Sequence, residues 1–201
     1  YKTDFFGILE GNGMSVLNIN ITSGKSVVSA GYIGSIKQAL NNGDNKPDYA
    51  AILNLTMVPK LVNFPNASIV GALVGTIENA NIQNVSVLSN LSNEVEQDTN
   101  TVIVSGQNIV GGVIGLAKTS ANIKNIISKV GSKATFIPSE ASRAIITSGI
   151  YNGSNLSNVS YAGNVIGYAY ASGMIAIKNI DVESSSAYAI ADRAGFVFGG
   201  I

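Results

Sequence analysis

The 201-residue chain contains no cysteine, no histidine and no tryptophan. Without cysteine it can form neither disulfide bonds nor thiolate metal sites. Without histidine it lacks the commonest general base and the commonest metal ligand. The composition therefore excludes Ser-His-Asp triads, Cys-His dyads and zinc sites with histidine ligands, and we expect neither a cofactor nor a metal site.

Charged residues are also scarce. They make up 12% of the chain, about half the usual share, and twelve basic residues balance twelve acidic ones. A nucleic-acid-binding protein would normally show a basic excess or a basic stripe. Here the lysines and arginines are scattered singly, which predicts no nucleic-acid partner and no polybasic membrane-surface patch.

No apolar run reaches the length of a membrane span, and no signal peptide opens the chain. We therefore expect no membrane insertion within this segment. The lack of cysteine fits an exported bacterial protein. Residues 195–201 begin a repeat that then stops. We expect residues 1–201 to form a single domain that is a fragment of a longer chain.

The chain instead holds a repeated motif, in which two glycines are separated by three mostly apolar residues. It occurs at residues 70–75, 110–115, 162–167 and 194–199, and residues 31–34 form a shortened copy. The glycines are Gly71, Gly75, Gly111, Gly115, Gly163, Gly167, Gly195 and Gly199. We expect glycines at tight corners, where a side chain would not fit, with a short buried strand between them.

The first glycines of successive copies are 40, 52 and 32 residues apart. A repeat of a few dozen residues is typical of stacked coils rather than of a closed globule. The unequal spacing predicts loops that bulge from the coils, at residues 41–48, 88–101 and 132–148. Single helical turns are candidates at residues 37–40 and 139–144.

A second element places an asparagine before an apolar residue. Its copies contain Asn18, Asn54, Asn84, Asn125, Asn158 and Asn179. In most copies apolar residues lie two before and one after the asparagine, as in a half-buried strand that approaches a bend. Asparagines at equivalent places in successive coils can form a hydrogen-bonded ladder, and we favour this structural role over a ligand-binding one.

The first copy lies in residues 15–21, which alternate in hydrophobicity. The alternation predicts a strand with Val16 and Asn18 on one face. Leu17, Ile19 and Ile21 are then expected on the other face.

The motif of glycine, three apolar residues and glycine, followed by a polar turn and Ile-x-Asn-Val, resembles the GLUG repeat of bacterial surface and secreted proteins. Residues 6–13 resemble the segment Phe-x-Gly-x-Leu-Asp-Gly-Asn-Gly that often leads into such repeats, with Glu10 in place of aspartate. Asn164 departs from the pattern in the third copy. Similar repeats occur in filamentous-haemagglutinin-like adhesins and in the non-catalytic part of immunoglobulin-A-cleaving metalloproteases.

This resemblance covers the chain from about Phe5 to Ile201 and implies a β-solenoid on a cell surface, without catalytic residues. The zinc motif of the protease family, His-Glu-x-x-His, is missing because the chain has no histidine. We therefore predict an all-β fold, a parallel β-helix or β-solenoid with irregular coils and inserted loops.

Paired carboxylates are the one catalytic type that remains. Asp181 and Glu183 would share a strand face, and a glycosidase needs two carboxyl groups at a defined separation. We favour a solvated face for them. Residues 41–48 are rich in oxygen ligands and resemble a loose calcium loop, for which an ordinary turn is the simpler interpretation.

Two further features have a structural explanation that we favour. Eight Asn-x-Ser/Thr sequons follow from the high asparagine content, and three of them belong to the repeated strand element. Tyr161, Tyr168 and Tyr170 cluster in sequence, and Tyr168 and Tyr170 would share a strand face. Stacking of aromatic rings between coils is favoured over a recognition patch.

The function expected from these observations is that of a non-catalytic structural or adhesive segment, extracellular or on a bacterial cell surface. Its partner would be a protein or glycan of a host or neighbouring cell, or another copy bound through the coil ends. Two alternatives stay open: a carbohydrate-active β-helix enzyme that uses carboxylates, and the accessory stalk of a larger secreted protease.

Overall fold

A computed structural model describes residues 4–38, 50–89, 102–135, 160–170, 173–182, 189–191, 193–195 and 197–201. These residues form strands, turns and bends, and none of them is helical. The predicted all-β class is therefore confirmed. Of the two candidate helical turns, Lys37 belongs to a strand, while residues 139–144 lie outside the described residues.

The strands are short, apart from three that exceed ten residues. In chain order they are β1 (Asp4–Phe5), β2 (Ile8–Glu10), β3 (Ser15–Thr22), β4 (Val27–Ala30), β5 (Ile33–Lys37), β6 (Ala50–Asn63), β7 (Ala67–Gly71), β8 (Val74–Leu88), β9 (Ile103–Gly106), β10 (Ile109–Gly111), β11 (Ile114–Lys129), β12 (Gly131–Ala134), β13 (Tyr161–Gly163), β14 (Ile166–Tyr170), β15 (Ile175–Val182), β16 (Ala189–Ile190), β17 (Arg193–Gly195) and β18 (Phe198–Gly200).

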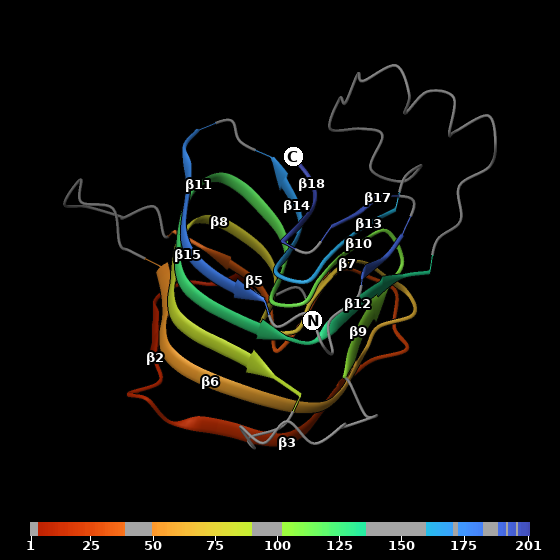
Figure 1. Cartoon of the computed structure of the whole chain (residues 1–201), viewed down its shortest axis with the longest axis horizontal. Coiled ribbons are helices and arrows are strands. Elements are labelled where there is room, and N and C mark those ends of the chain that lie inside the picture. Colours follow the sequence, from red (N-terminus) through yellow and green to blue (C-terminus); the bar gives the residue numbers. More distant parts are fainter. Residues whose placement is uncertain are drawn as a thin grey trace.

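The strands form two parallel sheets. The smaller sheet has the order β17-β13-β10-β7-β4. The larger has thirteen strands and contains the path β16-β12-β9-β6-β8-β11-β14-β18, with β1, β2, β3, β5 and β15 attached to it. Figure 1 shows the larger sheet as a curled surface, in which segments far apart in the sequence run side by side.

The pairing divides the chain into stretches that we call passes, each of which lies alongside the one before it. The first four passes contain β1–β4, β5–β7, β8–β10 and β11–β13. The fifth contains β14–β17, and β18 begins a sixth. In the smaller sheet Val70 pairs with Val110 and Val110 with Ala162, so residues about one repeat apart are direct neighbours.

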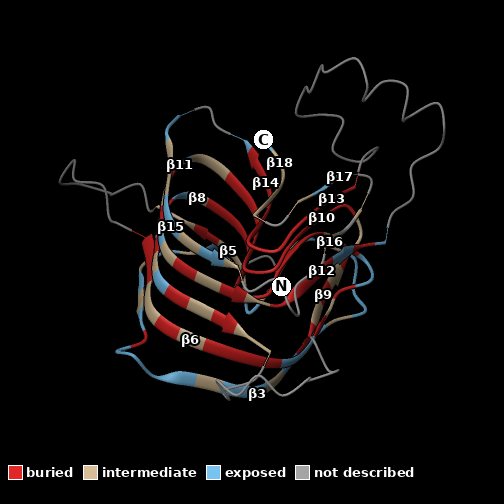
Figure 2. Ribbon diagram, in the orientation of Figure 1, coloured by how far each residue is buried: buried red, intermediate tan, exposed pale blue. Residues whose placement is uncertain are grey.

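The core lies between the two sheets and is built from the same positions in each pass. Ile52, Ile82 and Ile123 are neighbours in register and are fully buried. Branched apolar side chains suit such a row because each packs on its counterpart in the next strand. Figure 2 shows buried residues along β6, β8 and β11, whereas β3 of the first pass carries exposed and half-buried residues.

One predicted detail is wrong in β3. The alternation placed Val16 beside Asn18 and opposite Leu17, Ile19 and Ile21, but Val16, Ile19 and Ile21 turn toward the core and Leu17 is exposed. The reason is Asn18, whose φ of 57° is left-handed. The register with β6 shifts at this residue, so the side-chain alternation starts again after it.

Candidate functional site

The repeated glycines lie where the chain crosses from the smaller sheet to the larger one. In the copy at residues 70–75, β7 ends at Gly71 and β8 begins at Val74. Ala72 and Leu73 form the corner and are fully buried. The predicted short strand between the glycines is therefore wrong, because these residues change the direction of the chain from one sheet to the next.

The first glycine of each copy packs against the backbone of its own corner. Gly71, Gly111, Gly163 and Gly195 are neighbours in register. A Cβ atom at any of the four would collide with the carbonyl oxygen three residues ahead. Glycine is required here because of this close approach, since φ at these four residues lies outside the left-handed region.

The second glycines pack against one another between passes. A Cβ atom on Gly115 would lie 2.5 Å from the Gly75 carbonyl oxygen, and one on Gly167 would lie 2.7 Å from that of Gly115. A Cβ atom on Gly199 would lie 2.5 Å from the Gly167 oxygen. These stacked glycines allow the backbones of neighbouring passes to pack closely, which a side chain at any of these positions would prevent.

The asparagines of the second element occupy a different bend, within the larger sheet. Asn54, Asn84, Asn125 and Asn179 have φ between 53° and 54°, the left-handed conformation that asparagine tolerates. The last three each donate from Nδ2 to Oδ1 of the asparagine in the pass before, at 2.7 Å for Asn84, 2.6 Å for Asn125 and 2.8 Å for Asn179. The four side chains form a continuous amide ladder.

A glutamate stands at the foot of this ladder. Glu10 Oε1 accepts a hydrogen bond from Asn54 Nδ2 at 2.9 Å and another from the backbone N–H of Asn12 at 2.9 Å. Asn18 has no place in the ladder, because β3 pairs with β6 beyond Asn54, near Val58. Asn158 lies outside the described residues. The sequence indicates Glu10 only as part of the segment that leads into the repeats, and no signal there predicts its hydrogen bond with Asn54.

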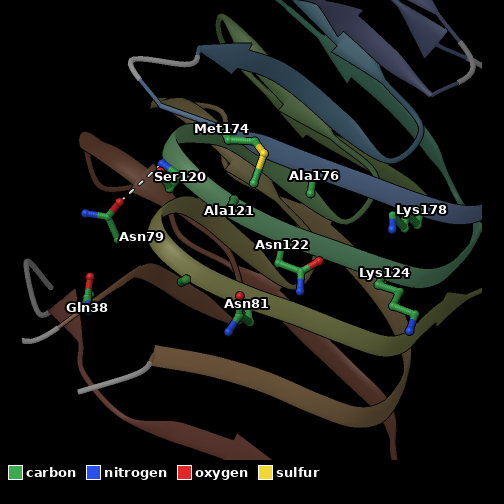
Figure 3. A pocket seen from close by; sticks show the side chains of 11 residues that line it. Gln38, Asn79, Asn81, Ser120, Ala121, Asn122, Lys124, Met174, Ala176 and Lys178 are labelled. Atoms are coloured by element: carbon green, nitrogen blue, oxygen red, sulfur yellow. Dashed lines mark hydrogen bonds between the residues drawn. The ribbon is translucent and has the colours of Figure 1, made fainter. Parts of the chain in front are cut away.

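A groove opens on the outer face of the larger sheet, beside the bends at Asn79 of β8 and Ser120 of β11. It has a volume of about 660 Å³. In Figure 3, Gln38, Asn79, Ser120 and Met174 lie along one side, Lys124 and Lys178 along the other, and Asn81 and Asn122 between them. Lys124 of β11 and Lys178 of β15 are direct neighbours in register. No signal in the sequence joined these residues, because they come from four passes.

A second groove, of about 730 Å³, lies where the outer face of β4 meets those of β5, β8 and β11. Ile69 and Leu116 contribute apolar surface, while the Ser29 hydroxyl bonds to the Thr76 hydroxyl at 2.8 Å. Charged residues of successive passes alternate in sign beside it: Asp4, Lys37, Glu78 and Lys118. Lys37 Nζ lies 3.0 Å from Asp4 and 4.0 Å from Glu78.

The tyrosines fill the same face in the later passes. Tyr161 and Tyr168 are buried, with ring centroids 4.7 Å apart and a tilt of 59°. They pack with Ile69, Ile109 and Leu116 in a second apolar cluster. Burial raises the pKa of both phenols above the ordinary value of 10.0, against the charge of Arg193, which lowers it. Tyr170 lies further along β14 and is exposed.

Of the predicted catalytic and metal-binding candidates, the structure describes only Asp181. Asp181 is exposed on β15, next to Ile127 of β11. Glu183 and residues 41–48 lie outside the described residues, as do most residues of the other predicted loops; residues 132–134 form β12. Within the described ranges no three acidic residues gather as a metal site, and no helix has the length and apolar character needed to span a membrane.

Asn164, which interrupts the third glycine motif, is fully buried. The Ser128 hydroxyl donates to its backbone carbonyl at 2.5 Å, and the Ser132 hydroxyl donates to Oδ1 at 3.3 Å. Its Nδ2 has no hydrogen-bond partner. The fourth and fifth passes therefore share a small polar cluster inside an otherwise apolar core.

The chain was compared with protein-family models, with curated proteins and with solved structures, and none of the three comparisons found a match.

Proposed function

We propose that the passes are coils of a parallel β-helix of the GLUG-repeat kind, and that this β-solenoid is a non-catalytic scaffold with a recognition surface. It would belong to a secreted or cell-surface bacterial protein. The observation that carries the proposal is the part that the repeated residues play in contacts between passes. The glycines and asparagines that recur in sequence make contacts from one pass to the next.

Stacking of this kind supports a mechanical role. Parallel backbone pairing and the amide ladder both run from pass to pass, so adding passes lengthens the body while each new pass pairs with the one before it. Outward positions are then free to vary and to meet a partner. The expected partners are a protein or glycan on a host or neighbouring cell.

The first pass supports self-association as a further mode of contact. Among the described residues β2 and β3 each pair only with β6, so one edge of each is unpaired. Large apolar side chains are exposed on this pass, including Phe6, Ile8 and Met14. Unpaired edges with exposed apolar side chains favour addition of further strands.

An adhesion assay tests the proposal. Beads coated with the 201-residue chain are expected to bind host cells or bacteria more than beads coated with an unrelated β-rich protein. Surface labelling with an antibody against the chain should stain intact cells of the source bacterium or its secreted fraction. If neither cell type binds and the antibody labels only lysed cells, the proposal is wrong.

An enzyme assay separates the alternative. Wild-type protein and a D181N/E183Q variant are incubated with a panel of polysaccharides, and new reducing ends are measured. We expect none with either protein. Cleavage by the wild type that is lost in the variant would replace the scaffold interpretation with a carbohydrate-active enzyme.

A further inference from the structure

The groove beside the lysine pair has a composition that fits an anionic ligand. Its lining contains Lys124 and Lys178, several side-chain amides and the Ser120 hydroxyl, and no carboxylate from the part of the chain that the structure describes. Asp181, three residues beyond Lys178 on β15, does not line it. Because neighbouring strands lie roughly 4.8 Å apart, two in-register lysines concentrate positive charge at one place.

The contrast with the other groove strengthens this assignment. In the second groove the sign of the side-chain charge alternates in the order Asp4, Lys37, Glu78 and Lys118. Charged side chains on neighbouring strands therefore attract each other there. Two lysines side by side repel each other instead, and no ion pair of either one is found among the described residues. An arrangement that costs stability in the free protein is explained if an anion binds there.

The uncharged residues of the groove indicate what kind of molecule bears the anionic group. Asn81 and Asn122 are neighbours in register and half-buried between the two sides of the groove, and Gln38 and Asn79 add further amides. Asn79 is fixed by hydrogen bonds from Thr119 Oγ1 at 3.0 Å and from the Ser120 backbone N–H at 3.3 Å. Amides both donate and accept, so they match the hydroxyl groups of a sugar.

The direction of the groove points to a linear chain. Its residues come from four successive passes, so the groove runs across the strands (Figure 3). Asparagine recurs on β8 and β11 (Asn81 and Asn122), and lysine recurs on β11 and β15, so like groups lie one strand spacing apart, as like groups do along a polymer. We propose that this groove binds an acidic polysaccharide across the strands, with Lys124 and Lys178 at its carboxylate or sulfate groups and the asparagines at its hydroxyls.

This inference rests on the proposed recognition function and gives it a substrate class. The test measures binding of the 201-residue chain to oligogalacturonate and to heparin oligosaccharides, which distinguishes carboxylate from sulfate recognition. Methyl-esterified oligogalacturonate is the matched neutral probe. We expect binding to at least one acidic probe that weakens with added salt, and little binding to the neutral one.

Variants locate the site. K124Q and K178Q should each weaken binding about two- to fivefold, the range for exposed ion pairs. K133Q changes an exposed lysine of β12 outside the groove and should bind like the wild type. N122A should weaken binding without changing its salt dependence, because it removes an uncharged contact.

Three results would overturn the assignment: equal binding of the neutral probe, an equal loss in K133Q and K178Q, or tighter binding of duplex DNA than of either glycan. Absence of binding to both acidic probes would also overturn it. Adhesion of coated beads that persists in K124Q/K178Q would then leave the scaffold function standing with another partner surface, whereas failure of wild-type beads to adhere would remove that function itself.

Discussion

Two bends recur in every full pass, and they are held in opposite ways. At the glycine corner the backbones of neighbouring passes come so close that no side chain fits between them. At the asparagine bend a side chain is required, because its amide joins each pass to the next. One bend is specified by steric exclusion and the other by hydrogen bonding, so their tolerance to substitution should differ strongly.

The largest expected effect is at the glycine corner. In G111A the new Cβ atom would overlap the Ile114 carbonyl oxygen, which belongs to the backbone and cannot rotate away. We expect a loss of at least about 3 kcal/mol in the free energy of unfolding, or no folded protein. Urea unfolding followed by circular dichroism measures it.

The matched control is G24A. Nothing lies within 4 Å of a Cβ atom built on Gly24, and its φ is outside the left-handed region. Its stability should equal that of the wild type or slightly exceed it. Equal losses in G24A and G111A would show that the corner does not depend on close backbone packing.

The next effect is at the asparagine bend. Asn84 donates to Asn54 and accepts from Asn125, so N84A removes two hydrogen bonds of about 1 kcal/mol each and leaves alanine in a left-handed conformation. We expect a loss of about 2–3 kcal/mol. N84G removes the same bonds without the conformational cost, and it should recover about 1 kcal/mol of that loss. If N84G is as unstable as N84A, the left-handed backbone is not a significant part of the cost.

Alkaline pH should lower the stability of the fold through Tyr161 of β13 and Tyr168 of β14, which lie on either side of the third glycine motif. The pKa of each phenol is raised in the folded protein by burial, so the neutral phenol is favoured by folding. This contribution to stability is complete below pH 10.0, the ordinary value, and is lost as the pH rises through the raised folded pKa. Stability measured across this range should fall less in Y161F/Y168F than in the wild type.

The smallest effect is expected at the foot of the ladder. E10Q keeps an oxygen that can accept from Asn54 Nδ2 and from the Asn12 N–H, and should change stability by less than about 0.5 kcal/mol. E10A removes the acceptor and should cost about 1 kcal/mol. An equal loss in E10Q and E10A would mean that the negative charge, rather than the presence of an acceptor oxygen, supports the first rung.

The all-β class could be predicted from composition and from the recurrence of short apolar runs between glycines. Details that depend on a left-handed residue could not. Asn18 reverses the alternation of β3, and asparagine is too frequent in this chain for sequence alone to show which ones adopt that conformation. The apolar residues Ala72 and Leu73 predict a strand but form a corner, because a fully buried corner and a fully buried strand are equally apolar in sequence.

The grooves were harder to predict than the fold. Lys124 and Lys178 are 54 positions apart, and only the parallel register makes them neighbours. In the sequence they appeared as single scattered charges. The same applies to Glu10, which accepts a hydrogen bond from Asn54 in the next pass. To predict contacts between passes, one must know which residues pair across neighbouring strands, and the unequal loop lengths hide that register in the sequence.

The number of residues differs between equivalent bends of neighbouring passes at some places and is the same at others. Between Ala30 and Ile33 the chain has one residue fewer than between their partners Val70 and Val74. Next to Thr119 it has one residue more than at the matching bend beside Asn79. Around Asn54, Asn84, Asn125 and Asn179 the register continues unchanged on both sides. Insertions and deletions can therefore accumulate during divergence at the other bends, while the asparagine positions keep homologous passes aligned.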